Sequence, residues 1–562
     1  MRMKLGKYAN RSLLTVLLAA GVATVPLAAC SGSSSATTSK STEAETVAAT
    51  SQAASDSQTV SDSNASDSSN EPLSEEPVTL QILTTRWGSM GDSFTQNQWL
   101  KDLEASTNVT PEWQVQSLND WGEQKSIMLA SGELPEVILG SQTFNDSDIL
   151  NNSEMFLDLT DLIDQHMPNL KAAMEETPEL KQTITFTDGK IYSLPRKLPS
   201  RPETCNQPII NKTWLDNLGL EEPTTIDELT TVLKAFKEQD ANGNGDTTDE
   251  YPISGAKGLS MDLLNPFGIT DLNGNHMMVE SDGSLVYYPT AENYKEGLKW
   301  LNELYQEGII DPESFTQDQT MLDAKRKNES VALVGFDYAW TPDSLFGQWS
   351  AEYEALAPII GPDGKQYAGG DANGVSSIVR NEAEITTSCQ NPELAAAWLD
   401  RFYTGEASIQ NFWGAIGTVI TQNNDGTYTL NDPPEGTSAD AWYWDQSLRD
   451  FGPKYVSSEF QEKIKLSSTS GDGLKMELSK LGDAYITTPF PNVIYTAEES
   501  EQLATLTTDI DKYVESTRAE WVSNGGIDEG WDAYVAQLKD LGLDDMIQIY
   551  TDAYNRYIAQ AK

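Results

Sequence analysis

The sequence predicts an α/β fold with two lobes, and two observations carry this prediction. Strand-like and helix-like segments alternate along the chain from Val78 onward. The part of the 562-residue chain after residue 77 is also too long for one hydrophobic core, and its length fits two lobes on the usual size of domains.

The alternation is clearest between residues 78 and 140. Val78, Leu80 and Ile82 alternate with polar residues, as in a strand with one buried face. A helix is expected near 97–106, a strand at 110–116, a helix at 121–131 capped by Asp120, and a strand at 136–140. This β-α-β-α-β order is typical of a parallel sheet with helices on both faces.

Local signals place further elements along the chain. Thr225 and Glu228 form a capping box that begins a helix ending near 239, and a second box at 496–499 begins a helical C-terminus. Asn391 followed by Pro392 is a favourable helix start, since proline fits the first helical turn. We expect another helix at 293–307.

The N-terminus predicts secretion. Basic residues precede an apolar stretch at 13–27, whose length of about fifteen residues is short of the ~20 that a spanning helix needs. The stretch ends in Leu27-Ala28-Ala29-Cys30, so residues 1–30 are interpreted as a signal peptide. This end resembles the lipobox of bacterial lipoproteins, which implies lipidation of Cys30. A plain signal peptide or a weak membrane anchor is the alternative.

Residues 31–77 consist mostly of Ser, Thr, Ala, Asp and Glu. Such a segment buries too little apolar surface to offset its ordering entropy, so we expect a disordered tether. A lipid anchor and a tether would hold a soluble domain at the extracytoplasmic face of the cell membrane.

The net charge of the chain argues against some classes of binding partner. A formal net charge of −49 argues against nucleic acid, which needs a basic footprint, and against adhesion to anionic lipid. Strong self-repulsion favours a soluble protein, which we expect to be a monomer. A cationic partner is the alternative explanation of the charge.

Few histidines and cysteines are available for zinc binding or for nucleophilic catalysis. His166 and His276 are the only histidines, which argues against most zinc sites and most Ser-His or Cys-His mechanisms. Apart from Cys30, the cysteines are Cys205 and Cys389, which could pair in an oxidising compartment or remain thiols.

Five motifs in register resemble one family. They are the stretch 121–139 with Met128-Leu129-Ala130-Ser131-Gly132-Glu133-Leu134-Pro135, Asp188-Gly189-Lys190-Ile191-Tyr192 before Leu194-Pro195, Asn211-Lys212-Thr213-Trp214-Leu215-Asp216 before Leu218-Gly219, Leu304-Tyr305-Gln306-Glu307-Gly308, and Trp531-Asp532-Ala533-Tyr534. They resemble the long carbohydrate-binding lipoproteins of the type-1 extracellular solute-binding family, which serve ABC importers.

The resemblance implies a periplasmic-binding-protein-like fold, in which crossover segments join two α/β lobes and a ligand cleft lies between them. It implies capture of a carbohydrate, delivery to the transmembrane subunits of an ABC permease, and no enzymatic activity. We expect lobe 1 at 78–200 and 371–425 and lobe 2 at 201–370 and 426–562, with the C-terminal helices on either. The crossovers are expected near 198–204, 367–371 and 421–432.

One loop predicts a calcium site. In the run Asp240-Ala241-Asn242-Gly243-Asn244-Gly245-Asp246, oxygen-bearing side chains alternate with small residues, as in the first half of an EF-hand loop. The twelfth position is Tyr251 instead of Glu, and no helix is expected to follow. The family resemblance includes a similar structural loop closed by an acidic pair, here Asp249 and Glu250. We predict calcium ligands at Asp240, Asn242, Asn244, Asp246 (through its carbonyl), Asp249 and Glu250. An acidic turn without metal is the alternative.

Candidate sugar-binding residues are aromatic or charged, because sugars present apolar faces and hydroxyl rims. Trp87 ends the first strand, where open α/β sheets bind ligands, and Trp340 resembles a sugar-stacking position of related proteins. The predicted ligand-binding residues are Arg86, Trp87, Tyr338, Trp340, Asp371, Trp413, Trp442 and Trp444. For each tryptophan, core packing is the alternative, and Trp214, Trp398 and Trp531 are assigned to the core.

Two other functions stay open on sequence grounds. A binding lipoprotein for a peptide or another non-sugar solute would share most of these features. A glycosidase would need two carboxylates ~5–10 Å apart across the cleft, and no local motif indicates such a pair.

Overall fold

The protein is described by a computed structural model that covers residues 72–87, 91–199, 201–270, 274–370, 378–468 and 471–560. These residues belong to one of the two compact units of the chain, Asp67–Lys562. The predicted signal peptide with Cys30, the tether up to residue 71, and Asp371 lie outside the described residues.

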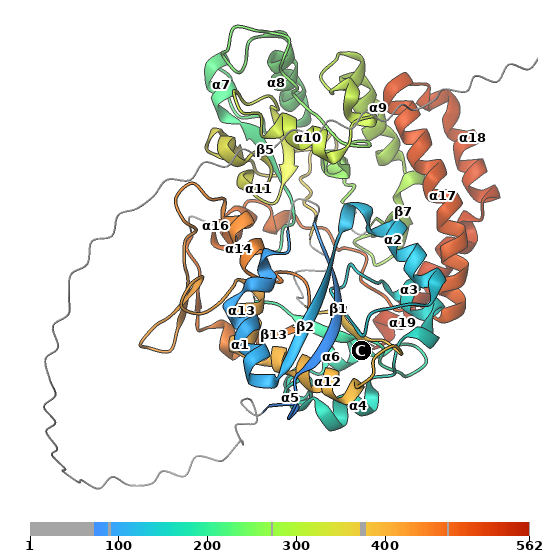
Figure 1. Cartoon of the computed structure of the whole chain (residues 1–562). Helices are drawn as coiled ribbons and strands as arrows, with labels where there is room; N and C mark the ends of the chain where they lie inside the picture. Colours follow the sequence, from blue (N-terminus) through green and yellow to red (C-terminus); the bar gives the residue numbers. More distant parts are fainter. Residues whose placement is uncertain are drawn as a thin grey trace, which may run out of the picture. The chain divides into compact units, whose positions relative to one another are not determined.

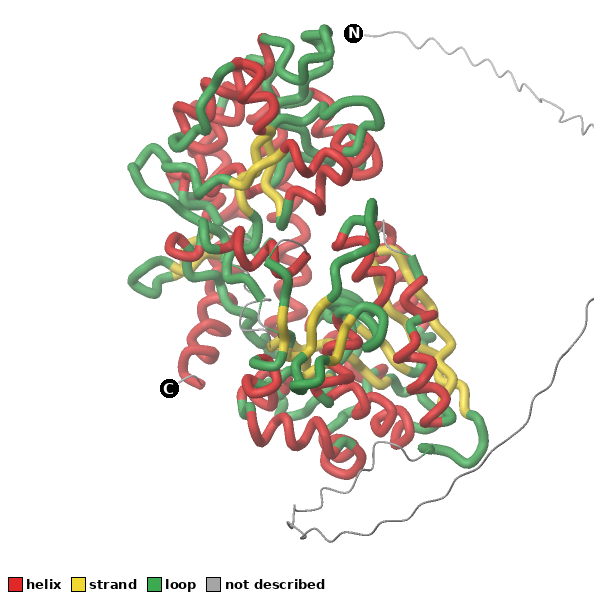
Figure 2. The backbone as a smooth tube through the Cα atoms, turned by 90° about the vertical axis from the view of Figure 1, so that its left-hand side faces the viewer, coloured by secondary structure: helices red, strands yellow, loops and turns green. Residues whose placement is uncertain are grey.

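Two groups of strands, each enclosed by helices, make up the described part of the chain (Figure 2). We call them the first and second lobes. The first lobe is built on a six-stranded sheet in the order β13-β4-β10-β3-β1-β2, and the second on a three-stranded sheet in the order β8-β5-β9. The predicted two-lobe α/β fold is therefore confirmed.

The elements of the first lobe come from two parts of the chain. They are β1 (Val78–Arg86), α1 (Gln98–Thr107), β2 (Val109–Ser117), α2 (Leu118–Ser131), β3 (Val137–Leu139), α3 (Asp146–Asn151), α4 (Thr160–His166), α5 (Pro168–Glu176), α6 (Glu179–Ile184), β4 (Leu194–Lys197), β10 (Ile378–Ile385), α12 (Pro392–Asp400), α13 (Gly405–Phe412), β11 (Ile420–Gln422), β12 (Tyr428–Leu430), α14 (Ala439–Gln446), β13 (Lys454–Tyr455), α15 (Ser458–Gln461), β14 (Ile464–Lys465) and α16 (Gly471–Ser479).

The elements of the second lobe lie between those parts and after them. They are β5 (Gln207–Asn211), α7 (Lys212–Leu218), α8 (Ile226–Glu238), the 3₁₀ helix η4 (Met261–Phe267), β6 (Met277–Val279), β7 (Leu285–Tyr287), α9 (Glu292–Gln306), α10 (Gln319–Arg326), β8 (Phe336–Ala339), α11 (Pro342–Phe346), β9 (Tyr353–Ala355), α17 (Ala497–Asn524), α18 (Ile527–Asp540) and α19 (Leu543–Gln560).

The predicted parallel core of the first lobe is confirmed. Strand β1 pairs in parallel with both β2 and β3. Its alternating side chains serve two cores, because Leu80 and Ile82 join the cluster beneath α1, α4, α5 and α12, whereas Leu83 joins the cluster with α2 and α3. Helix α2 begins three residues earlier than expected, because Ser117 rather than Asp120 caps it, and it ends at Gly132 with φ of 72°.

The assignment of residues after 425 to the second lobe is corrected by the strand pairing. Strand β13 pairs in parallel with β4 and thus extends the sheet of the first lobe. Leu198, Trp413, Tyr443 and Val456 share a hydrophobic cluster, which holds the following segment on the same lobe. The chain returns to the second lobe only after α16.

Helix α17 contacts both lobes. It packs against α9 of the second lobe and against α3 of the first, and Figure 1 shows it beside α18 and α19. At 28 residues it is on the order of 40 Å long, which is enough to span the two contacts. Its predicted capping box is present, since Thr496 and Glu499 bond each other's backbone N–H groups.

The crossover segments lie side by side. Cys205 N donates to Gly369 O at 2.9 Å, and Ala368 N donates to Tyr485 O at 2.9 Å. The first two segments match the predicted positions, and the third is formed by residues near 482–493 instead of 421–432. The latter stretch contains β11 and β12, which pair with each other as an antiparallel hairpin.

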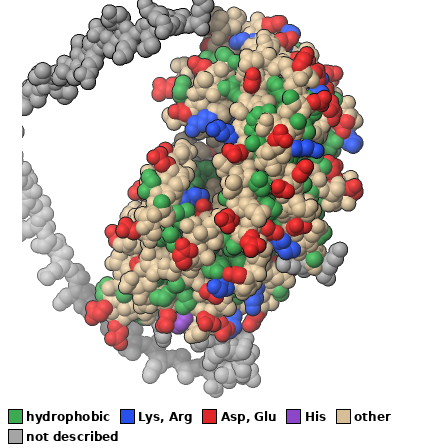
Figure 3. Space-filling view, turned by 90° about the vertical axis from the view of Figure 1, so that its right-hand side faces the viewer, with side chains coloured by type: hydrophobic (Ala, Val, Ile, Leu, Met, Phe, Trp, Pro, Cys, Tyr) green, Lys and Arg blue, Asp and Glu red, His purple; other side chains and the backbone are tan. Residues whose placement is uncertain are grey.

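The surface charge, the helices and the cysteines can each be compared with what the sequence predicts. Acidic side chains are spread over the face shown in Figure 3 and do not gather in one patch, which suits a self-repelling, solvated surface. Of the helices that the structure describes, none is long and apolar enough to cross a membrane. Cys389 is a buried free thiol, so it forms no disulfide with Cys205, which answers the question of pairing left open by the sequence.

Trp214 provides a test of the second-lobe core. Its side chain is fully buried and meets the Phe236 ring edge-to-face at 5.2 Å. We expect Trp214→Ala to lower the free energy of unfolding by about 3–5 kcal/mol through loss of apolar contact and the cavity left behind. Urea unfolding would measure this. Trp87→Ala, at a site 44% exposed, is the control and should change it by under about 0.5 kcal/mol.

Candidate ligand junction and metal loop

Aromatic and charged side chains from both lobes meet beside the crossovers, and we call this cluster the junction. It consists of Arg201, Trp340, Phe412, Trp413, Tyr443, Arg449, Asp472 and Lys475. Trp340 follows β8 of the second lobe, Arg201 lies on the first crossover, and the remaining residues belong to the first lobe. The junction therefore contains residues of both lobes and of the first crossover.

Asp472 is the charged centre of the junction. Arg449 donates to both of its carboxylate oxygens, at 2.9 and 2.6 Å, and Arg201 lies 3.3 Å away. The indole N–H of Trp413 donates to the same carboxylate. Burial alone would raise the pKa of Asp472, but the two guanidinium groups lower it well below its ordinary value.

The backbone of Arg449 is held in an unusual conformation. Its φ of 56° lies in the left-handed region, which few non-glycine residues adopt. The bidentate pair with Asp472 and the Phe412 ring, 4.4 Å from the guanidinium carbon, fix its side chain. Surroundings that hold a residue in such a region are common at functional sites.

Trp340 is half-buried, and two cations contact its ring. The guanidinium carbon of Arg201 lies 4.8 Å from the centre of its ring, and the Lys475 ammonium lies 4.7 Å from it. Lys475 also donates to the carbonyl of Cys205 on the first crossover. The predicted sugar-stacking tryptophan thus takes part in cation–π contacts between the lobes.

A second contact between the lobes lies at α14. Ser438, the N-cap of α14, donates its hydroxyl to Asp343 of α11 at 2.7 Å. Two of the predicted residues, Trp442 and Trp444, are on this helix. Trp442 is half-buried against the cluster around Trp413, and Trp444 is buried.

Arg86 is buried within the first lobe. Its guanidinium donates to the carbonyls of Trp444 and Ser447, and it lies 4.5 Å from the Phe94 ring and 4.7 Å from that of Trp444. Burial lowers the pKa of Arg86 to about 10. These contacts join the end of β1 to α14, so Arg86 positions an aromatic helix.

The remaining predicted residues are not all in the junction. Tyr338 is buried in the core of the second lobe, and Trp87 is exposed after β1. The structure thus brings Trp340 and Trp413 together, places Trp442 and Trp444 on the neighbouring helix α14, and places Arg86 at the end of β1 against that helix. None of these placements tests ligand contact, which remains a prediction.

Sequence reasoning missed Arg201, Arg449, Asp472 and Lys475. They lie in separate segments, and no local motif marks them. The available signal was Arg201, a charged residue inside a predicted crossover. Because charges are seldom buried without partners, their burial became apparent only once the segments were folded together.

More charged groups lie beneath the junction. Arg196 is 3.0 Å from Glu382, and the ammonium of Lys454 donates to the carbonyls of Phe451 and Gly452 at 2.6 and 2.7 Å. Burial lowers the pKa of Lys454 to about 7, although the nearby Glu382 carboxylate opposes the shift. The sheet edge β4-β13 therefore rests on a buried polar network.

The predicted calcium loop connects α8 to an extended segment. Asn242 and Asn244 donate to the two oxygens of Asp249 at 3.0 and 2.7 Å, and Gly245 N donates to Asp240 at 2.9 Å. The side chains of the loop therefore point toward one another. Among the described residues, no His, Cys, Asp and Glu side chains gather in threes as a metal-holding group, so asparagine and backbone oxygens would have to complete this site.

Two buried oxygens of the loop fit a cation. Asp240 Oδ1 and Glu250 Oε2 are buried and accept no hydrogen bond from the described residues. Glu250 is fully buried, which raises the pKa of its carboxyl. A bound Ca²⁺ would satisfy both oxygens, since this ion takes six to eight oxygen ligands.

The fold is that of a two-lobe solute-binding protein. A family model described as bacterial extracellular solute-binding protein matches residues 98–428, and the chain belongs to this family. The fructooligosaccharide ABC transporter substrate-binding protein FusA of Streptococcus pneumoniae is 33% identical over 481 residues, which are 82% of this chain and 87% of FusA.

Solved structures agree with this assignment. FusA in complex with kestose has a TM-score of 0.77 and 31% identity, covering 86% of this chain and 100% of that one. A FusA EF-hand mutant in complex with fructo-nystose has a TM-score of 0.76 and 30% identity over the same shares. The predicted family membership is therefore confirmed.

Replacing Asp472 tests the charged centre of the junction. Asp472→Asn leaves Arg449 buried without its counter-charge, so we expect the free energy of unfolding to fall by about 3–5 kcal/mol at pH 7. Because the folded pKa of Asp472 is lowered, its contribution is complete above about pH 4 and is lost at lower pH. The difference between wild type and variant should therefore shrink below pH 4.

Urea unfolding between pH 7 and 3 measures this difference. Glu477→Gln, on the exposed side of the same helix, is the control and should stay close to wild type. Equal stability of wild type and Asp472→Asn at pH 7 would contradict the role given to this carboxylate.

Proposed function

We propose that this protein captures an oligosaccharide outside the cell and delivers it to the transmembrane subunits of an ABC importer. The observation that carries the proposal is the 33% identity to a fructooligosaccharide-binding protein along most of both chains. The junction supports it, because aromatic rings beside hydrogen-bonding charged groups suit the apolar faces and hydroxyl rims of sugars.

The proposed mechanism is binding with closure. Open and closed arrangements of the lobes exchange, and the ligand shifts the population by the contacts it adds in the closed form. Arg201 and Lys475 would couple this motion to Trp340, since both contact its ring. The closed shape is then what the permease recognises.

We propose binding without chemistry at the junction. A glycosidase acid needs a raised pKa so that it holds its proton at neutral pH. Asp472 has the opposite property, because two arginines keep its carboxylate ionised. Such a group suits a fixed ion pair.

The proposed anchor is a lipid on Cys30. It follows from the apolar stretch that ends in Leu27-Ala28-Ala29-Cys30 and from the tether after it. The proposed form is a monomer at the extracytoplasmic face of the membrane, and a net charge of −49 supports a partner other than nucleic acid.

We also propose that the loop 240–250 binds structural Ca²⁺ through Asp240, Asn242, Asn244, Asp249, Glu250 and the carbonyl of Asp246. The ion would neutralise the acidic oxygens and hold the loop closed. Since Asn217 donates to Ala241 O at 2.9 Å, the closed loop also fixes α7 against α8.

A thermal-shift screen tests the main proposal. The mature domain from residue 72 onward is heated with oligosaccharides, including kestose, in the presence of calcium. A ligand at 100 times its Kd adds ~2.7 kcal/mol to stability, which raises the melting temperature measurably. We expect one class of sugars to do so without forming product on long incubation.

Two results of the screen would count against the proposal. Stabilisation by peptides with no response to any sugar would favour a receptor for another solute. Slow conversion of a stabilising sugar would indicate an enzyme.

Calcium removal tests the loop. Chelation should lower the melting temperature of the wild type. If calcium was present at 100 times its Kd, its removal lowers the free energy of unfolding by up to ~2.7 kcal/mol. Asp249→Asn should abolish this response. Asp246→Asn is the matched control, because Asp246 is proposed to bind through its carbonyl, and it should keep the response. Equal sensitivity of both variants would refute the ligand set.

A further inference from the structure

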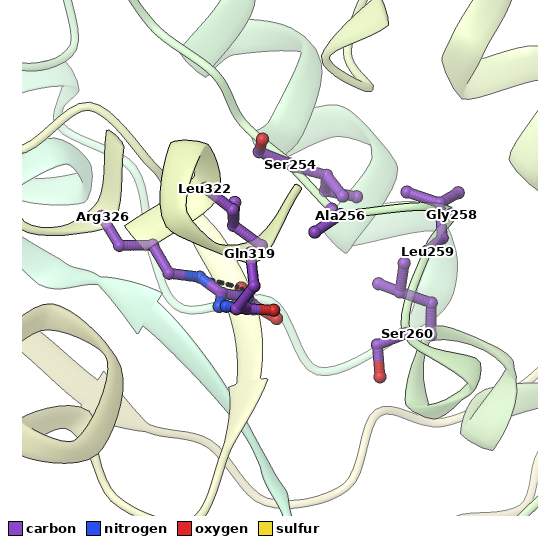
Figure 4. Close-up of a pocket in the computed structure, with 12 residues that line it drawn as sticks. Ser254, Ala256, Gly258, Leu259, Ser260, Gln319, Leu322 and Arg326 are labelled. Carbon is purple, nitrogen blue, oxygen red and sulfur yellow. Dashed lines mark hydrogen bonds and ion pairs between the residues drawn. The ribbon is translucent and has the colours of Figure 1, made fainter. Parts of the chain in front are cut away.

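A cavity of about 240 Å³ lies in the second lobe (Figure 4). Four elements line it: the loop that carries Ser254, Ala256 and Ser260, the 3₁₀ helix η4 through Leu263, the helix α10, and strand β8 through Asp337. Its volume is below the usual range for drug-sized ligands, so it suits one small ring better than a whole oligosaccharide.

Helix α10 presents one face to the cavity. Gln319, Leu322 and Arg326 line it, at the i, i+3 and i+7 positions that share one side of a helix. Leu322 supplies an apolar wall, and Gln319 and Arg326 supply hydrogen-bonding groups. The lining thus combines the two chemical characters of a sugar ring.

Arg326 and Asp337 form a fixed pair at the wall. Arg326 Nε donates to Asp337 Oδ2 at 3.1 Å, and one terminal nitrogen donates to the same oxygen. Asp337 Oδ1 accepts from Tyr338 N at 2.8 Å, which fixes the carboxylate. The other terminal nitrogen, Nη1, makes no hydrogen bond to any residue that the structure describes, so it is available to a ligand.

The loop that forms the opposite wall is rigid. Ser314 accepts the N–H of Gly255 through its hydroxyl, at 3.0 Å, and the N–H of Gly258 through its carbonyl, at 2.8 Å. Gln317 donates to Gly255 O at 2.6 Å. A side chain at Gly255 would lie 2.1 Å from Gly258 O, so glycine is required there. The cavity is therefore preformed.

The cavity lies close to the crossovers. Asp262 lies between the lining residues Ser260 and Leu263, and it accepts a hydrogen bond at 2.9 Å from Asn206, which follows the first crossover. Asp337 lies on β8, three residues before Trp340, which directly follows this strand. An oligosaccharide bound at the junction could thus reach the cavity with one of its ends.

We propose that this cavity is the subsite for the terminal ring of the ligand, and that the ring is uncharged. Because Asp337 neutralises Arg326, the pair offers a donor and an acceptor to adjacent hydroxyls without favouring an anion. A hydroxyl accepts from Arg326 Nη1 and its neighbour donates to Asp337, while Leu322 contacts the apolar face. This inference rests on the proposed function.

Two variants test the subsite by calorimetric titration with the best oligosaccharide of the thermal-shift screen. Ala256→Leu fills the cavity and should weaken binding at least about tenfold. Gln319→Ala removes an exposed polar group at the rim and should weaken it about fivefold, with no risk to the core. Thr320→Leu, an exposed neighbour on α10 that does not line the cavity, is the control and should bind like wild type.

The outcomes separate the two proposals. If the wild type binds an oligosaccharide and both cavity variants bind it equally well, the subsite is overturned and the proposed function stands. If the wild type binds no oligosaccharide, the proposed function fails and the subsite with it. Preferred binding of a sugar with an anionic end group would also overturn the inference of an uncharged ring.

Discussion

Three stretches of chain cross beside one another between the lobes, and their backbone hydrogen bonds are the constraint on which the rest depends. Ala368 takes part in two of these bonds with the third stretch, and Gly370 leaves no space for a side chain, since an added Cβ would lie 2.8 Å from Ile486. A hinge of this kind lets the lobes rotate while their internal packing is kept. The junction lies beside these stretches, since Lys475 donates to the carbonyl of Cys205.

Burying the charged groups of the junction costs desolvation free energy, and the contacts among these groups offset that cost. Each cation of the junction has a defined partner: Asp472 for Arg201 and Arg449, and the Cys205 carbonyl for Lys475. Beneath the junction, backbone carbonyls accept from Lys454. Buried ion pairs contribute little net stability, but removal of one partner is costly. Such a network therefore holds the junction in one geometry.

Local signals predicted the elements well where the responsible interaction is local. The capping boxes at Thr225 and Thr496 and the cap at Asn391 are all present, because each involves residues three positions apart. The start of α2 was misplaced, since Ser117 and Asp120 are both acceptable caps. The third crossover was also misplaced, because strand pairs such as β4 with β13 join residues more than 250 positions apart.

The sequence by itself determined the α/β class, the family, and the loop at 240–250, since these depend on periodicity and on motifs within short windows. Tertiary structure alone decided which charges share the junction, which lobe holds the segment after residue 425, and that Arg326 and Asp337 border one cavity. The physical reason is that burial and pairing depend on segments far apart in the chain, and only folding brings these segments within hydrogen-bonding distance.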